Sequence, residues 1–208
     1  MKYPAFYDEI DPIALRDPLA AFLGAVGDGI IEVRYLDAVR LAGHSCPTVA
    51  GAWLMARCAL RELYGVDTPV RGGIRVQMRD EPGDGVCGVI AAVFTLITGA
   101  ASGGGFQGLA GKYNRRDLLS FGHGVEGSGG VAGVARFARM DTGRAVTVDY
   151  DHAAVPVDPD MMPLMQKILG GLAAPGDEER FRDLWTSRVH AILLEHGDGL
   201  VTVTVEGG

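Results

Sequence analysis

The stretch Gly43-His44-Ser45-Cys46-Pro47-Thr48, which stands directly ahead of an apolar helical pattern, constrains the fold of this chain most. Proline is favoured in the first turn of a helix, so the sequence predicts a helix that begins at Pro47 and runs to Tyr64. Cys46 is then expected at the N-cap, where free amide N–H groups and the helix dipole favour a thiolate. His44 is free to turn its ring toward the same place. A thiolate and an imidazole together suit zinc or a related transition metal ion, but two ligands are too few for a site.

The chain has three cysteines, and each has a different sequence context. Cys58 lies in the middle of the helix expected after Pro47, where a cysteine behaves as a small buried apolar residue. Cys87 follows the turn-rich run 80–85 and directly precedes a very apolar segment at 88–98, so it also stands near the start of a helix. Added to the two ligands above, it would give three protein ligands and an open fourth position. Catalytic and exchange-capable zinc sites have that arrangement.

Four short motifs follow one another along the chain: His44-Ser45-Cys46-Pro47, Cys87-Gly88-Val89, Thr98-Gly99 and Gly111-Lys112. The FmdE-like family, which is named after a component of formylmethanofuran dehydrogenase, carries a His-x-Cys-Pro element, a Cys-x-Val-Asp-Ala element, a Thr-Gly-Cys-Thr segment and a Gly-Lys in the same order. Residues 30–122 therefore resemble that family. The resemblance implies a metal site at His44, Cys46 and Cys87. It also implies association with a redox enzyme, because the relatives are named after a component of a molybdenum or tungsten enzyme.

The chain departs from the family pattern at positions that matter for its chemistry. Ile90 stands where the family has an aspartate, and Ala100 stands where it has a cysteine. No cysteine follows Cys87, so the zinc-ribbon tail of some relatives is missing. Loss of the aspartate removes an obvious general acid or base. This difference favours metal binding without established catalysis.

The segment 99–111 consists almost entirely of small residues and is followed by Lys112. A flexible connector is one interpretation. The alternative is a loop in which backbone N–H groups, including that of Gly111, and the Lys112 ammonium hold an anionic ligand. The spacing of a phosphate-binding P-loop is not met, because Tyr113 takes the position of its hydroxyl residue. His123, which lies between glycines further along the chain, is a candidate fourth metal ligand or proton carrier.

Charge and composition limit the class of protein. The net charge of −7 and the lack of a basic run argue against a nucleic acid or an anionic membrane as the main partner. The N-terminus carries early acidic residues and no apolar signal-peptide core, and the apolar stretch 86–101 is too short to span a bilayer. With three cysteines, one of them expected in the core, the chain suits a reducing compartment. We therefore expect a cytoplasmic protein.

Alternating and helical patterns predict one α+β domain over residues 1–208, with a mixed or antiparallel sheet packed against helices. The core motif region is 30–122, and a hairpin with further helices occupies 130–208. Strands are expected at 31–35, 74–78, 131–139, 145–150 and 200–205. Helices are expected after Asp17-Pro18, from Pro47, at 88–98, after Asp158-Pro159 and from Asp177, and a short turn is expected after Asp11-Pro12.

Two functions are consistent with these residues. In the first, which we favour, the chain is a metal-binding protein with a pocket for a small anionic ligand, and it has an accessory role without turnover of its own. In the second, it is a metal-dependent enzyme that acts on a small substrate bearing a carboxylate or a phosphate. A purely structural metal is a third interpretation. The apolar helices at 88–98 and 160–170 also predict a homodimer.

Overall fold

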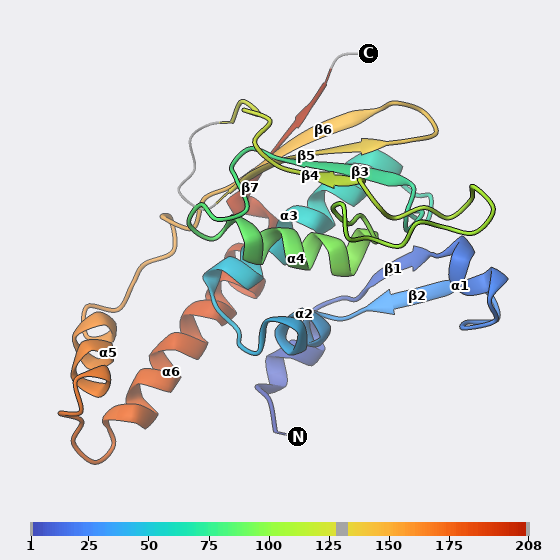
Figure 1. Ribbon diagram of the computed structural model, residues 1–208. Helices are drawn as coiled ribbons and strands as arrows, with labels where there is room; N and C mark the ends of the chain where they lie inside the picture. Colours follow the sequence, from blue (N-terminus) through green and yellow to red (C-terminus); the bar gives the residue numbers. More distant parts are fainter. Residues whose placement is uncertain (1, 128–132, 207–208) are drawn as a thin grey trace.

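A computed structural model describes residues 2–127 and 133–206 and shows the α+β fold expected from the sequence (Figure 1). In the described residues, five strands form the main sheet in the order β4-β3-β5-β6-β7, and β1 pairs with β2 in a separate two-stranded sheet. β3 and β4 are parallel, whereas the other neighbours in the main sheet are antiparallel. The strands are β1 (Ile13–Arg16), β2 (Ile30–Val33), β3 (Ile74–Met78), β4 (Leu119–Ser120), β5 (Val134–Arg139), β6 (Ala145–Tyr150) and β7 (Val201–Val205).

Helices α3 (Pro47–Tyr64) and α4 (Cys87–Thr98) lie side by side across one face of the main sheet (Figure 1). Strand β3 shows why this face is covered. Successive side chains of a strand point to opposite faces, and Ile74, Val76 and Met78 are all buried on the helix side. Both helices and this amphipathic strand confirm the sequence prediction. None of the helices in the described residues has the length and apolar character that crossing a membrane requires.

The N-terminal part differs from the sequence expectation in two places. After Asp11-Pro12 the chain enters strand β1 and not the expected turn. The strand expected at 31–35 ends at Val33, because α2 (Tyr35–Ala42) begins directly afterwards. The Asp37 carboxylate accepts a hydrogen bond of 2.9 Å from the Arg34 N–H and so caps that helix. A local cap therefore overrides the alternating pattern that predicted a longer strand.

Two short helices frame the two-stranded sheet. The aromatic N-terminal segment forms a 3-10 helix at Ala5–Glu9, with Phe6 and Tyr7 buried in the core. The helix expected after Asp17-Pro18 is confirmed as α1 (Pro18–Phe22). Its N-cap is Asp17, whose carboxylate accepts the N–H groups of the second and third helical residues.

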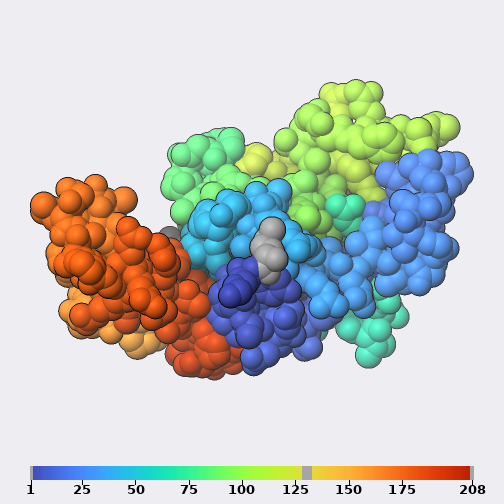
Figure 2. Space-filling model, turned by 90° about the horizontal axis from the view of Figure 1, so that it is seen from below, coloured from blue at the N-terminus to red at the C-terminus, as the bar shows by residue number. Residues whose placement is uncertain are grey.

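The C-terminal helices form an arm that projects from the body of the molecule (Figures 1 and 2). α5 (Met161–Leu169) and α6 (Asp177–His190) pack against each other as a hairpin, and both confirm expected helices. The chain then passes through a π-helical turn at Ala191–His196 into β7 at the edge of the main sheet. The hairpin expected at 131–150 is confirmed as β5 and β6, although positions 131 and 132 lie outside the described residues.

Candidate functional site

The His44–Pro47 segment joins α2 to α3 in the way its sequence predicts. Gly43 ends α2 with a left-handed backbone, at φ 75°, a conformation that glycine adopts without steric cost. Cys46 is the N-cap of α3, and Pro47 is its first helical residue. The Cys46 sulfur accepts a hydrogen bond of 3.5 Å from the Val49 N–H. The predicted N-cap is therefore confirmed, and the sulfur acts there as an acceptor.

The His44 ring is exposed and is anchored at one nitrogen. Nδ1 donates to the Ala42 carbonyl at 2.9 Å, which leaves Nε2 as the ring nitrogen that could meet a ligand. Histidines that bind metals usually hold their second nitrogen in this way. The ring lines an apolar groove of about 260 Å³ between α2 and α4, which we call the His44 groove. Its other lining residues are Leu41, Ala42, Gly88, Val89, Ala92 and Val93.

Three aromatic side chains form hydrogen bonds with the residues on either side of Cys46. Trp185 of α6 donates from Nε1 to the Ser45 carbonyl at 2.8 Å. Tyr150 of β6 donates to the Pro47 carbonyl at 3.0 Å, and Tyr35 of α2 shares a hydrogen bond of 2.7 Å with the Ser45 hydroxyl. Burial raises the pKa of both tyrosines, so they remain protonated at neutral pH. We call Tyr35, Tyr150 and Trp185 the aromatic clamp.

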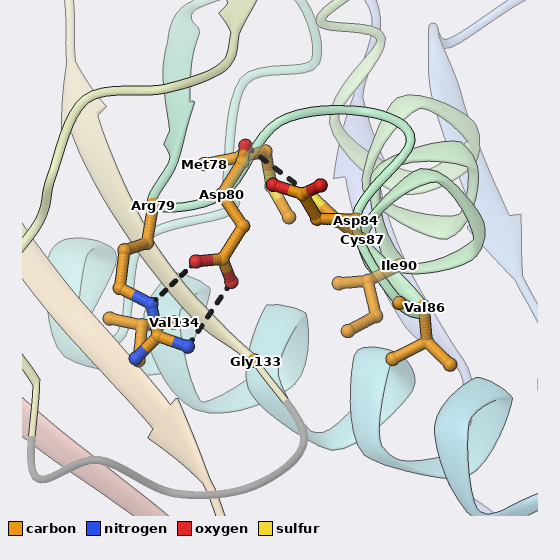
Figure 3. Close-up of a pocket in the computed structure, with 10 residues that line it drawn as sticks. Met78, Arg79, Asp80, Asp84, Val86, Cys87, Ile90, Gly133 and Val134 are labelled. Carbon is orange, nitrogen blue, oxygen red and sulfur yellow. Dashed lines mark hydrogen bonds and ion pairs between the residues drawn. The ribbon is translucent and has the colours of Figure 1, made fainter.

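Cys87 is the first residue of α4 and lines a pocket of about 160 Å³ with residues of β3, β5 and the preceding loop (Figure 3). We call it the Cys87 pocket. The thiol donates to the Asp80 carbonyl at 3.5 Å, and the Asp80 side chain is paired with Arg79 at 2.9 Å. Burial raises the pKa of the Cys87 thiol, and the negative charges of Asp80 and Asp84 raise it further. Cys87 is therefore held as a neutral donor, whereas the Cys46 sulfur accepts a hydrogen bond.

The predicted ligands lie in one region but do not form a ready-made set. His44 faces Gly88 and Val89 on one flank of α4, while the Cys87 sulfur faces the pocket on the other flank. Among residues 2–127 and 133–206, no group of three or more His, Cys, Asp or Glu side chains is arranged to hold a metal ion. The donor types of His44, Cys46 and Cys87 fit zinc, but their arrangement in this structure does not.

Cys58 is buried in α3, as the sequence predicts. Burial raises the pKa of its thiol to about 12, and the negative charge of Asp198 adds to the shift. Arg57 and Arg61 both bind Asp198, with nitrogen–oxygen distances of 2.5 Å. The residue is therefore part of a structural contact between α3 and the C-terminal turn. All three cysteines carry free thiols.

The chain leaves α4 at the end opposite Cys87, and part of the glycine-rich loop that follows lies beside α1 (Figures 1 and 2). Its first residues, Ser102, Gly104 and Gly105, share a surface hollow with Gly88 of α4. Lys112 and Gly111 are exposed and line neither the Cys87 pocket nor the His44 groove. The next residue, Tyr113, stacks on Phe22 of α1 with ring centroids 5.4 Å apart, which holds this end of the loop beside α1. Thr98 and Gly99, which the resemblance grouped with the site, end the helix instead.

The inward-facing cation of this loop is Arg115, which the sequence did not single out. Its guanidinium is buried and donates to the Asp17 carboxylate at 2.7 Å, and Arg71 donates to the other oxygen at 2.9 Å. A Cβ atom at Gly72 would lie 2.0 Å from the Arg115 guanidinium, and one at Gly99 would lie 2.5 Å from it. These two glycines were the sequence signal for a buried side chain here, because glycine lets another group approach the backbone closely. The loop therefore binds the protein's own carboxylate.

His123 lies on the loop after β4, and both of its ring nitrogens have partners. Nε2 lies 2.7 Å from the Ser120 hydroxyl, and Nδ1 lies 3.3 Å from the Gln77 amide. It lines neither the Cys87 pocket nor the His44 groove. The structure thus does not bring His123 to the predicted ligands.

Comparison of the chain with models of known protein families and with curated protein sequences found no match. The function is therefore inferred from the residues and geometry described above.

Proposed function

We propose that this protein binds one divalent transition metal ion, for which zinc is the best match, through His44, Cys46 and Cys87. It would act as a metal-binding accessory protein, as the resemblance to the FmdE-like family of formylmethanofuran dehydrogenase implies. The observation that carries the proposal is the anchored His44 ring, whose Nδ1 donates to the Ala42 carbonyl and so leaves Nε2 as the nitrogen for a metal ion. Together with a cysteine at a helix start two residues later, this gives the nitrogen and sulfur donors that zinc prefers.

Coordination by all three residues requires side-chain movement at the start of α4. His44 is exposed and is held by the Ala42 carbonyl, whereas the two sulfurs are engaged with the Val49 N–H and with the Asp80 carbonyl. The surroundings of Cys87 favour a cation, because Asp80 and Asp84 place negative charge beside it. A bound metal ion would replace the proton of the thiol.

An open fourth position would admit a small anionic ligand. The His44 groove gives access to the histidine from solvent and is lined mostly by apolar side chains. A carboxylate or phosphate with a small apolar part is the ligand class that suits a metal ion at this edge. Lys112 has no part in this proposal, because it lines neither the Cys87 pocket nor the His44 groove.

The alternative is a metal-dependent enzyme that acts on a small carboxylate- or phosphate-bearing substrate. It needs a general acid or base beside the metal ligands. Asp80 and Asp84 are the carboxylates that line the Cys87 pocket, and Asp80 is already paired with Arg79. Because Asp80 is held by Arg79, it is a poor candidate for the general acid or base, and the binding role is the better-supported function.

Metal analysis of purified protein tests the proposal. We expect about one equivalent of zinc per chain in the wild type and in Cys58→Ser, and a large loss in the Cys46→Ser, Cys87→Ser double variant. Cys58→Ser is the matched control, because it removes a thiol that lies outside the candidate site. Equal metal content in the double variant and the control would refute the assignment of ligands.

Association with a second copy and with a redox enzyme forms part of the same proposal. Apolar side chains are exposed at Val89 on α4 and at Met162, Leu169 and Leu172 on the α5–α6 arm. These surfaces support a homodimer, and the free thiols suit a cytoplasmic location. Light scattering should give twice the 21.9 kDa of one chain. A mass of one chain at micromolar concentration would exclude a stable dimer.

A further inference from the structure

The outer side of β7, an edge strand of the main sheet, has backbone groups left over for hydrogen bonding. In the described chain β7 pairs with β6 alone, and the bonds at its two ends show which residues face β6: the Leu200 carbonyl accepts from β6, and the Glu206 N–H donates to β6, both at 3.1 Å. Backbone groups of an antiparallel strand point alternately to its two sides. The even-numbered positions therefore face β6, and the N–H and C=O groups of Val203 and Val205 point outward. Neither residue has an outer backbone partner among the described residues.

The composition of β7 does nothing to protect this edge. Exposed edge strands in natural proteins usually carry charges, proline or a bulge, because their free backbone groups would otherwise pair with another strand. The sequence of β7 is Val-Thr-Val-Thr-Val, without charge, proline or glycine. Its register with β6 is continuous from Val201 to Val205. The strand is therefore a regular edge of β-branched residues that is open to pairing.

The side chains of β7 divide between the two faces of the sheet. The three valines lie on the side of α3, opposite buried residues of β6, yet Val205 is 49% exposed. Thr202 and Thr204 are exposed on the other face. Apolar surface therefore remains partly uncovered next to the free backbone groups.

The sequence of β7 is the same in both directions about Val203. Such a strand matches its own copy when the two run antiparallel around a two-fold axis at Val203. Val201 then faces Val205 of the second copy, and Thr202 faces Thr204 of the second copy. β-Branched and threonine pairs are favourable neighbours across strands. Because β7 is uncharged, the two strands meet without like charges, although each chain has a net charge of −7.

The outward backbone groups also meet in this register. Val203 and its counterpart form a hydrogen-bonded pair, and the Val205 N–H meets the Val201 carbonyl of the second copy. The Val201 N–H takes no part, because it donates to the Asp198 carbonyl of its own chain. Thr202 and Thr204 of the two copies form the non-hydrogen-bonded pairs, in which opposite side chains lie closest together.

We propose that β7 of one copy pairs with β7 of a second copy, so that the two main sheets join into one continuous sheet across a two-fold axis at Val203. This inference rests on the homodimer of the proposed function and adds the surface through which the copies bind. That surface is separate from α4 and from the α5–α6 arm. The matching of the strand to itself favours a second copy over an unrelated extended peptide.

Charge substitutions at Thr202 and Thr204 test the pairing, because both side chains are exposed and would face each other across the axis. The variant Thr202→Lys, Thr204→Lys places like charges opposite each other. The variant Thr202→Lys, Thr204→Glu changes the same two positions but places opposite charges there, so it is the matched control. Analytical ultracentrifugation over a range of protein concentrations gives the dimer dissociation constant of each full-length protein.

We expect the like-charge variant to raise the dimer dissociation constant roughly ten- to a hundredfold, since like charges opposed across an interface are unfavourable. The opposite-charge variant should stay within about fivefold of wild type. Amide hydrogen exchange gives a second measurement. The N–H groups of Val203 and Val205 should exchange slowly in the wild-type dimer and faster in the like-charge variant at the same concentration.

A wild-type dimer that the like-charge variant does not weaken would overturn the inference and place the homodimer of the proposed function at another surface. Equal weakening by the two variants would also overturn it, because the proposed register distinguishes like charges from opposite ones. A wild type that sediments with the 21.9 kDa of one chain at every concentration would overturn both this inference and the homodimer.

Discussion

The two ends of α4 carry similar sequence signals and have different structures. At its start, the candidate ligands His44 and Cys87 lie on two flanks of the first turns, and His44 is open to solvent. At its end, a glycine-rich loop and a basic residue, the pattern of an anion site, close on Asp17 of the same chain. The difference is the direction of the cation. Arg115 points inward and meets a protein carboxylate, whereas Lys112 is exposed to solvent, so the buried cation of the loop end has a structural role.

The largest effect should come from removal of the buried cation. Arg115→Ala leaves the Asp17 carboxylate, whose side chain is 4% exposed, with one of its two arginine partners gone. Breaking a buried pair on one side typically costs about 3–5 kcal/mol in the free energy of unfolding. Urea denaturation followed by circular dichroism measures this cost.

Lys112→Ala serves as the control, since it removes a cation of the same loop that faces solvent. We expect a change within about 0.5 kcal/mol. Equal destabilisation by both variants would remove the contrast between the inward and outward cations.

Acidification should weaken the same end of α4. Burial alone would raise the pKa of Asp17, but hydrogen bonds from Arg71 and the Ala20 N–H and the charge of Arg115 outweigh it and leave the pKa lowered. A carboxyl group whose pKa is lowered by folding stabilises the fold above its unfolded pKa of about 3.9 and loses that contribution as the pH falls through the folded value. The stability advantage of the wild type over Asp17→Asn should therefore be constant above about pH 5 and shrink below about pH 4. An advantage that does not change with pH would contradict this account.

Much of the fold followed from local signals, and most of the contacts around the site did not. Pro47 after Cys46 predicted both the N-cap and the helix start, because both depend on residues next to each other. The clamp from Tyr150 and Trp185 could not be predicted in this way, since it depends on how β6 and α6 pack on α3. Gly51 was the local trace of that packing, because a Cβ atom there would lie 2.0 Å from the Tyr150 ring. Arg115 was missed for the same reason, because its partner Asp17 is 98 positions away.

A smaller effect should separate the two helix-start cysteines. Cys46 is an N-cap, so Cys46→Ala should cost about 1 kcal/mol, whereas Cys46→Ser keeps an acceptor at the cap and should be nearly neutral. Cys87 lies one residue inside α4, after the N-cap Val86, so Cys87→Ser and Cys87→Ala should differ by less than about 0.5 kcal/mol. Thermal denaturation of the four variants measures these differences. An equal gap between Ser and Ala at both positions would show that Cys46 has no special capping role.

Because Cys46→Ser keeps the cap, it separates metal binding from stability and gives the most direct test of the central claim. Calorimetric titration of zinc into the metal-free wild type, Cys46→Ser and Lys112→Ala compares the two ends of α4 in one experiment. We predict one site per chain in the wild type, the same affinity in Lys112→Ala, and an affinity at least roughly a hundredfold lower in Cys46→Ser. No binding to the wild type, or equal affinity in Cys46→Ser, would contradict the placement of the metal site at the His44–Cys46 segment.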